Sequence, residues 1–448
     1  MATQFDVTCG LSCCGAGVTW SILFVFIGIW MLRPRRRRYT ADYSETESEP
    51  KPTRGLRLSH KGKLDGDKLS RSSPIPWNIV VPTHRRERAT EGLLLGSAVA
   101  EALSLSRHGI HPRVGLKLFG RNPLQYQFVP GIGTTNHRTH SLLMTFQAML
   151  QSKATPSLFA SNLLRRIAWY QRSFPLRHIY THGKRLVAKM RNVAIADSVT
   201  VGLADDPLVR SAVMSVMLQG CADSGMTWFQ SGVGVSHADT RVLNASLLVA
   251  YSVQLAQMVD QQNIVPTEII AQLVAVTEDS EFRSVLMEMN DALVQNQSVA
   301  TFAKQQGWAN GLPNDIFAAA IVGVYAWLRH PKRFRNCVER TILLGGACSS
   351  AATVAGALSG ISLGKRGIPY EWLRHLSTYP HNSKWREELI ERVKDWPHGV
   401  DDIQSTAAMP SFIFGQLVRN SIFSGFRILH GLIRIPMRLS QFSIEKRR

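Results

Sequence analysis

Apolar residues recur three and four positions apart through the central part of the chain, the spacing that gathers them on one face of an α-helix. This spacing is clearest in residues 91–105, 245–259, 316–328 and 335–344. The alternation of apolar and polar residues that is typical of a half-buried strand is nearly absent. The pattern therefore predicts an all-α fold.

Two helix starts can also be located. Thr155 and Asp206 each precede a proline. Threonine and aspartate are favoured at the N-cap, and proline is well tolerated at the first helical position. Because every predicted helix carries an apolar stripe, residues 87–396 are expected to form one helical domain around one core.

The N-terminal segment has a different pattern. Residues 7–32 contain no charged side chain, and residues 20–32 (WSILFVFIGIWML) are strongly apolar. A run of roughly 20 such residues can cross a bilayer as a helix. Residues 33–38 (RPRRRR) follow directly, whereas a cleaved signal peptide carries its positive charge before the apolar run. We predict that residues 1–32 hold a single transmembrane helix; the alternative is a helix buried in the soluble domain.

The arginines also predict an orientation. Positive residues flanking a membrane helix stay on the cytoplasmic side, which places the N-terminus outside and the main domain in the cytoplasm. Residues 33–86 are rich in Ser, Lys, Arg, Glu, Pro and Gly and lack periodicity, so a disordered basic tether is expected there.

The C-terminal part, residues 397–448, begins acidic and ends as a basic amphipathic tail. In residues 412–439, bulky apolar residues alternate with arginine at helical spacing. This pattern is typical of a helix that lies in a membrane interface, and it is equally that of a helix packed on the domain. Both interpretations remain open from the sequence, with a slight preference for the membrane.

Composition narrows the partners only in part. The chain has 448 residues, a formal net charge of +20 and 45% apolar residues, so it can bury a large core and attracts polyanions. Nucleic acid, anionic lipid and phosphorylated ligands all fit that charge. No Walker loop, GxGxxG or nucleic-acid module occurs, so nucleic acid is the least favoured partner. Six cysteines without paired spacing in the body favour a reducing compartment.

Several histidine pairs have spacings that could place two ligands near one another. They are His108 with His111, His137 with His140, and His178 with His182. Zinc accepts imidazole ligands, but no carboxylate or thiolate stands at a comparable spacing, so we predict no metal site. Cys348 follows two glycines without the flanking pattern of a nucleophile elbow, and a packed small residue is the better interpretation.

Four segments, in order along the chain, resemble the ADP-ribosylglycohydrolase family. Residues 91–103 (EGLLLGSAVAEAL) are similar to its opening motif, and residues 136–150 (NHRTHSLLMTFQAML) to its Thr-Asp-Asp-Thr helix start. Residues 188–195 (AKMRNVAI), with Ser236-His237 after them, resemble its third motif. Residues 343–358 (LLGGACSSAATVAGAL), followed by an Ile-Pro and a tryptophan, resemble its closing signature. The resemblance implies an orthogonal helical domain.

The resemblance also implies two magnesium ions, bound by carboxylates and Thr hydroxyls, that assist cleavage of the glycosidic bond to ADP-ribose. This chain departs from the family at those positions. The first acidic motif reads Asn136, His137, Arg138, Thr139, and the second reads Ala347, Cys348, Ser349, Ser350. Residues 131–150 and 340–370 contain no Asp or Glu. No metal site is expected, although magnesium is the family's cofactor.

The expected function is therefore that of a membrane-anchored, catalytically inactive homologue that binds ADP-ribose, an ADP-ribosylated protein or a related nucleotide. The alternatives are an active glycohydrolase with an atypical site, or a structural membrane-surface protein with a vestigial cleft. Glu101, which stands where the family has Asp, is the one weak catalytic candidate. The expected ligand-binding residues are His137, Arg138, Thr139, Gly345, Gly346, Ser349 and Ser350.

Overall fold

In a computed structural model of the chain, the described residues are 80–121, 123–152, 155–174, 206–221, 224–237, 239–258, 265–396 and 409–445. All of them lie in one compact unit, Pro74–Arg448. The predicted transmembrane segment, the tether before residue 80, and the 188–195 motif lie outside the described residues. No helix in the described ranges is long and apolar enough to cross a membrane.

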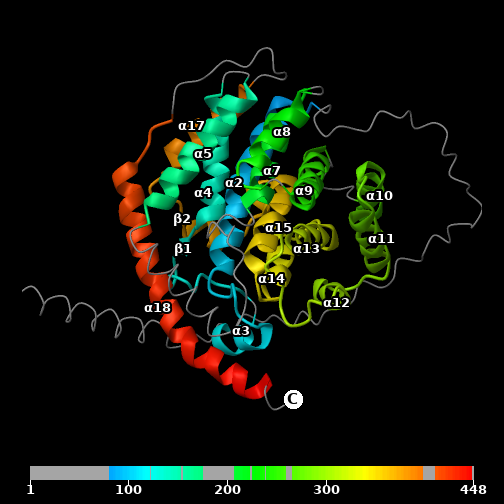
Figure 1. The fold of residues 1–448 in the computed structure, drawn as a ribbon, viewed down its shortest axis with the longest axis vertical. Helices are drawn as coiled ribbons and strands as arrows, with labels where there is room; N and C mark the ends of the chain where they lie inside the picture. The colour runs from blue at the N-terminus through cyan, green and yellow to red at the C-terminus, as the bar shows by residue number, and fades with distance from the viewer. Residues whose placement is uncertain are drawn as a thin grey trace, which may run out of the picture. The chain divides into compact units, whose positions relative to one another are not determined.

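The described part of the chain is mainly helical, which confirms the predicted all-α class (Figure 1). The helices are α2 (Thr83–Ser104), α3 (Pro112–Phe119), α4 (His137–Leu150), α5 (Pro156–Arg172), α7 (Asp206–Met217), α8 (Gly225–Gly234), α9 (Thr240–Met258), α10 (Pro266–Val276), α11 (Ser280–Val294), α12 (Val299–Gln305), α13 (Ile316–Arg329), α14 (Phe334–Ile342), α15 (Cys348–Leu363), a 3₁₀ turn η2 (Lys365–Gly367), α16 (Tyr370–Arg374), α17 (Ser383–Lys394) and α18 (Ile413–Glu445).

Two very short strands are also present. β1 (Gly133–Thr134) pairs in parallel with β2 (Leu376–Ser377). This pairing ties the loop before α4 to the segment after α16. The sequence did not predict these strands, because two residues are too few to show an alternating pattern.

The predicted helices occur where the apolar spacing placed them. α5 starts at Pro156 and α7 at Asp206, and α13 starts at Ile316. In α13 the Asp315 side chain accepts the Ala318 N–H at 3.3 Å, a side-chain N-cap. Local sequence signals therefore locate these helix starts to within a residue or two.

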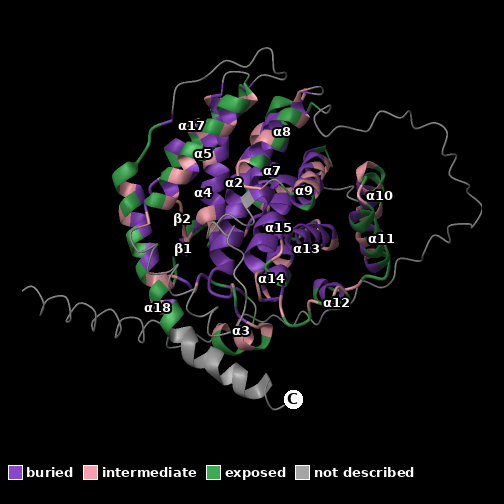
Figure 2. Cartoon of the chain, in the orientation of Figure 1, coloured by how far each residue is buried: buried purple, intermediate pink, exposed green. Residues whose placement is uncertain are grey.

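The centre of the domain is the pair α2 and α15, which pack closely against each other. Glycines on both helices make this approach possible. A Cβ on Gly96 would lie 2.2 Å from the Gly356 carbonyl oxygen, and one on Gly92 would lie 2.1 Å from that of Gly360. Figure 2 shows both helices buried along most of their length. The small-residue pattern of residues 343–362 is thus explained by backbone contact at the core.

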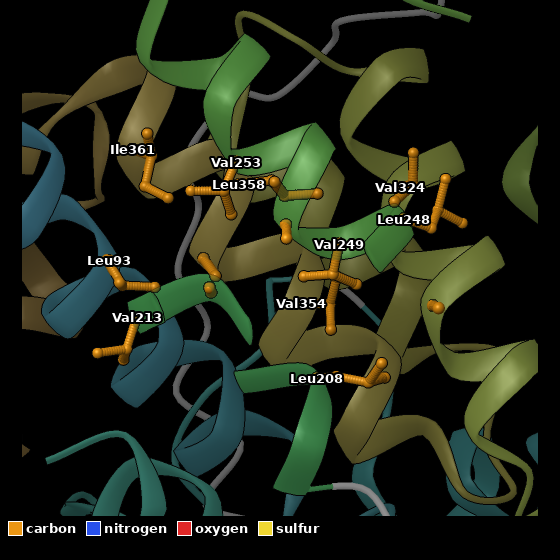
Figure 3. Packing of buried hydrophobic residues seen from close by; sticks show 14 of the residues in the cluster. Leu93, Leu208, Val213, Leu248, Val249, Val253, Val324, Val354, Leu358 and Ile361 are labelled. Carbon is orange, nitrogen blue, oxygen red and sulfur yellow. The ribbon is translucent and has the colours of Figure 1, made fainter. Parts of the chain in front are cut away.

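Around this pair, α4, α7, α9, α13 and α14 complete the core. Leu93 of α2 and Ile361 of α15 belong to one cluster with Val213 of α7 and Val249 of α9 (Figure 3). All are at most 3% exposed. Burial of apolar area at about 25 cal/mol per Å² is the main favourable term for such a core. The motif residues lie at the C-terminal end of α2 and at the starts of α4 and α15. The packing of these helices therefore fixes their positions.

Candidate functional site

Glu101, in the last turn of α2, forms the centre of the motif cluster. Its side chain is fully buried. The Oε2 atom accepts the Asn136 N–H at 2.9 Å, the Thr139 N–H at 3.1 Å and the Thr139 hydroxyl at 2.6 Å. The Oε1 atom accepts the Arg138 N–H at 3.0 Å. Both carboxylate oxygens are thus occupied by donors from the start of α4.

These contacts cap α4 from another helix. The first N–H groups of a helix have no partner within it, and a negative charge there is favourable. The Asn136 side chain forms no cap hydrogen bond, and the first turn of α4 contains no acid. The carboxylate of Glu101 supplies what the local sequence lacks. Its observed contacts are those of a structural group.

Arg138 is buried beside this carboxylate, with 3% of its surface exposed. Its Nη1 atom lies 3.8 Å from Glu101 Oε1, and its Nη2 atom donates to Ser350 Oγ at 2.9 Å. The guanidinium therefore connects the first turn of α4 to the start of α15. This bond joins the two positions where the family carries its acidic motifs.

The neighbouring serines complete the connection. Ser349 Oγ lies 2.6 Å from Ser104 Oγ, and Ser104 donates to the Glu101 carbonyl at 2.7 Å. Both serines are fully buried. Ser349 and Ser350 were expected in the site from the sequence, whereas Ser104 was not. Its position three residues after Glu101 on the same helix was the available signal.

Gly345 and Gly346 form a turn that leads into α15. Their φ angles are +65° and +63°, a region that favours glycine. The Gly346 N–H donates to the Ile110 carbonyl at 2.8 Å, and the following Ala347 N–H donates to Leu312 at 2.8 Å. These N–H groups are bonded to the protein itself. The glycine pair allows three backbone segments, around residues 110, 312 and 346, to lie in direct contact.

The expected ligand-binding residues thus converge, but with different exposure. All four of Arg138, Thr139, Ser349 and Ser350 are buried. Arg138 is bonded to Ser350, Thr139 to Glu101, and Ser349 to Ser104. Gly345 is also buried. His137 and Gly346 are half-buried, and these two are the members of the set that face the surface in part.

The helix α18 packs beside the same cluster. Arg419 donates to the Thr135 carbonyl, next to the cap of α4, and Asn420 Nδ2 donates to Ser173 Oγ at 2.6 Å. His430 Nε2 lies 2.8 Å from the Phe128 carbonyl, and the rings of Phe423 and Phe128 are 4.9 Å apart. One face of the basic tail is therefore bound to the domain. The site residues expected from the sequence include none from α18.

The other face of α18 remains exposed. Among the described side chains of this helix, Phe414, Leu417, Ile422 and Leu432 are each more than a third exposed. The same helix thus combines a face packed on the domain with an exposed apolar face. Packing on the domain agrees with one interpretation of the tail, and contact of the tail with a membrane stays a prediction.

The residues present do not fit the magnesium pair that the family resemblance implies. Magnesium requires hard oxygen ligands in near-octahedral geometry. The one carboxylate in the cluster is that of Glu101, whose oxygens accept four hydrogen bonds, and a guanidinium that cannot be deprotonated lies beside it. The described residues contain no group of three or more His, Cys, Asp or Glu that could hold a metal ion. No chemical step through a metal can be derived from this arrangement.

Comparison with known families supports the resemblance. The family model for ADP-ribosylglycohydrolase matches residues 82–401, well over half of the chain. The chain belongs to the ADP-ribosylglycohydrolase family. The match ends at residue 401, before α18 begins.

Comparisons with solved structures and with curated proteins add little to the family assignment. A solved structure described as an ADP-ribosylglycohydrolase-related protein complex is similar at 18% sequence identity, over 69% of this chain and 97% of that chain, with a TM-score of 0.46. No curated protein matches the sequence.

Proposed function

We propose that this ADP-ribosylglycohydrolase homologue is catalytically inactive and acts as a membrane-anchored binding or scaffolding protein. The observation that supports inactivity is the contact set of Glu101. Its two oxygens cap α4 and face Arg138, so the carboxylate has no free oxygen for a metal ion or an attacking water.

The charge of Arg138 supports the same proposal. A divalent cation within a few ångströms of a buried guanidinium is repelled in a medium of low dielectric constant. By the family resemblance, Arg138 stands at an Asp position of the first acidic motif, and its partner Ser350 stands at the Thr position of the second. The former reaction centre is thereby a structural junction between α2, α4 and α15.

The test is hydrolysis of an ADP-ribosylated protein by the purified full chain with magnesium or manganese, beside an active family member as positive control. We expect no release of ADP-ribose above background. Release of ADP-ribose that depends on the metal would instead support an active enzyme with an atypical site.

Binding of ADP-ribose at the former cleft is the second part of the proposal. His137 and Gly346 support it, because they are the half-buried members of the cluster. His137 also precedes Arg138, whose guanidinium is suited to a diphosphate. Calorimetry of the full chain with ADP-ribose tests this. We expect ADP-ribose to bind the wild type, and to bind His137→Ala and Arg138→Gln more weakly. Lys332→Ala, a change outside the cluster, is the control and should bind like the wild type.

If ADP-ribose neither binds in calorimetry nor raises the melting temperature, the cleft is vestigial and the scaffold role alone remains. Because Arg138→Gln removes a buried charge, its fold is checked by circular dichroism. His137→Ala is the decisive variant, since its side chain is half-buried and its loss leaves the Glu101 contacts in place.

Membrane anchoring is proposed from the sequence of residues 20–38 and from the outer face of α18. An apolar helix followed by arginines holds the domain at an anionic leaflet, and a second apolar contact then forms at high effective concentration. Alkaline carbonate extraction of the full chain tests the anchor. We expect it to stay with the membrane, and a chain lacking residues 1–32 to be released; release of the full chain would contradict the anchor.

A further inference from the structure

The helix α18 carries its charged residues on the side that faces the domain. Between residues 413 and 432, every exposed residue is uncharged. The two arginines of this stretch, Arg419 and Arg427, are buried and half-buried. A helix that packs on a soluble domain normally presents its charged side to water and its apolar side to the core. On α18 the side that faces outward is apolar and free of charge.

The exposed apolar residues follow one line along this helix. The line runs from Phe414 to Leu432 at intervals of three and four residues, which keeps it on one side of the helix. Leu417 and Ile428 lie on it, and two small residues occupy the positions between them. All four apolar side chains are more than a third exposed. The line is about 27 Å long at 1.5 Å per residue, and an exposed apolar patch of this kind marks contact with a protein or a membrane.

The exposed side of α5 combines apolar and basic residues. Leu164 and Trp169 are more than a third exposed, and Arg165 and Arg172 are exposed beside them. Tryptophan is enriched at membrane interfaces, where its ring lies at the level of the head groups. A guanidinium pairs well with phosphate oxygens. The side chains of α5 therefore suit the head-group region of a bilayer.

The exposed side of α5 borders the outer side of α18. A pocket of about 290 Å³ lies between α4, α5 and the start of α18, and its lining includes Arg165, Trp169 and Ile413. Further along α18, Asn420 donates to Ser173, which follows α5 directly. Figure 1 shows both helices on the same side of the domain. The apolar line and the arginines of α5 thus belong to one continuous surface.

This side of the domain also lacks acidic residues. No Asp or Glu occurs in residues 102–196 or 403–444, so α3, α4 and α5 carry none and α18 carries only Glu445 at its end. α17, which contacts the segment before α18, is balanced, with four basic and three acidic residues. α10 and α11, on the opposite side of the domain in Figure 1, carry four acidic residues and one arginine. The domain therefore has a basic side and an acidic side.

Charge selects the partner for the basic side. A second copy that met the domain through this side would bring the arginines of both α5 helices together with no acid to offset them, and like charges across an interface are unfavourable. A nucleic acid offers phosphates but no hydrocarbon for the apolar line. An anionic bilayer offers both, because its acyl chains accept the apolar side chains and its head groups attract the arginines.

We propose that the exposed side of α5, with Arg165 and Trp169, and the outer side of α18, from Phe414 to Leu432, form one docking surface for an anionic bilayer. Docking orients the domain with α5 and α18 on the membrane and with α10 and α11 away from it. This role deepens the membrane part of the proposed function and rests on it, because the anchor brings the surface close to the bilayer. It adds a requirement for anionic lipid, which a spanning anchor does not have.

The test uses the full chain in nanodiscs of phosphatidylcholine, with or without phosphatidylserine. Both kinds contain a phospholipid with a photoreactive diazirine in its acyl chain, and labelled peptides are identified by mass spectrometry. With phosphatidylserine, we expect labels in residues 156–172 and 413–432. No labels are expected in residues 280–294, although Met287 and Val294 there are more than half exposed. Without phosphatidylserine, labelling of α5 and α18 should fall at least about fivefold, the effect of one basic residue near an anionic surface.

Two substitutions on the docking surface have matched controls elsewhere. Leu417→Glu places a charge in the apolar line, so labelling should fall to the level seen without phosphatidylserine, and Met287→Glu on α11 should leave it unchanged. Arg165→Glu should weaken labelling about fivefold or more. Lys304→Glu, at an exposed position on α12, changes the net charge equally and should have no effect. All four positions are exposed, and circular dichroism checks that the variants are folded.

Three results would each overturn the docking surface. They are no labels in α5 and α18 with phosphatidylserine, equal labelling with and without it, and unchanged labelling in Leu417→Glu and Arg165→Glu. Crosslinks between two copies at α18 in place of lipid labels would assign this side to a second copy.

Carbonate extraction of the same full chain separates the docking surface from the anchor. A chain that resists extraction but carries no labels in α5 and α18 has the anchor without the docking surface. A chain that carbonate releases but that is labelled there has the docking surface without the anchor.

Discussion

The Glu101 carboxylate accepts the backbone N–H of Arg138 at 3.0 Å, while the guanidinium of the same arginine lies 3.8 Å from the same oxygen. The Glu101 carboxylate thus caps α4 and also balances the buried positive charge of Arg138, a residue of α4. Removing one partner of a buried ion pair is strongly destabilising, because the other charge remains without compensation.

Glu101→Gln is therefore expected to lower the free energy of unfolding by about 3–5 kcal/mol. The matched control is Glu281→Gln, whose exposed pair with Arg241 contributes at most about 1 kcal/mol. Urea denaturation of both variants measures the difference. Equal loss in the two would contradict a structural role for Glu101.

Gly96→Ala is expected to disrupt the contact between α2 and α15, because the new Cβ would lie 2.2 Å from the Gly356 carbonyl oxygen. Overpacking of this kind costs about 1–3 kcal/mol or more. Gly425→Ala is the control, since nothing lies within 4 Å of its Cβ position on α18, and alanine is the better helix former. Thermal unfolding should separate them, with a lower midpoint for the first and an unchanged or higher one for the second.

Docking of α18 is expected to depend on Asn420, which is fully buried and donates to Ser173 Oγ. Asn420→Ala leaves that contact unmade at a cost of about 1–3 kcal/mol. Hydrogen–deuterium exchange should then speed up in the N-terminal half of α18. Ser421→Ala, one position along on the exposed side, should leave exchange unchanged; the same increase in both would show that α18 is not held through Asn420.

Stability is expected to fall as the pH drops from about 6.5 toward 4. Burial lowers the pKa of His381 to about 4 in the folded protein, so the unfolded chain takes up its proton first. The unfolded state then binds more protons in this window, and the contribution is fully present only above the unfolded pKa. His140, whose pKa is also lowered by burial, acts in the same direction.

His381→Phe should flatten this decline between pH 6.5 and 4.5, above the range where most carboxylates titrate. Melting temperatures measured at several pH values give the slope for both proteins. An identical slope in the variant would show that His381 does not titrate between the two states.

Most of the fold could be predicted from sequence, because helical periodicity and capping are local properties. Residues 316–328 carry their apolar stripe and their Asp315 cap within a few positions, and α13 follows from them. The glycine pair and small-residue helix at 343–358 likewise indicated the family, whose model matches residues 82–401. The absence of acids at both motif positions needed no structure either.

The role of the site residues could not be predicted in this way. From the sequence, Glu101 is a weak catalytic candidate and Arg138 an expected ligand contact. In the structure the two residues contact each other, and Glu101 also binds the start of α4. These contacts connect residues that are 35 to 38 positions apart, and Arg138 reaches Ser350 over 212 positions. No local pattern encodes such a meeting.

The sequence by itself determined the helices, the family and the loss of the acidic motifs, because each is written in neighbouring residues. Tertiary structure decided that Glu101 of α2 caps α4, that one face of α18 packs beside this cluster, and that two histidines line the same pocket as two arginines. The physical reason is the packing of α2 against α15, where glycine lets the backbones touch and so fixes which distant side chains meet.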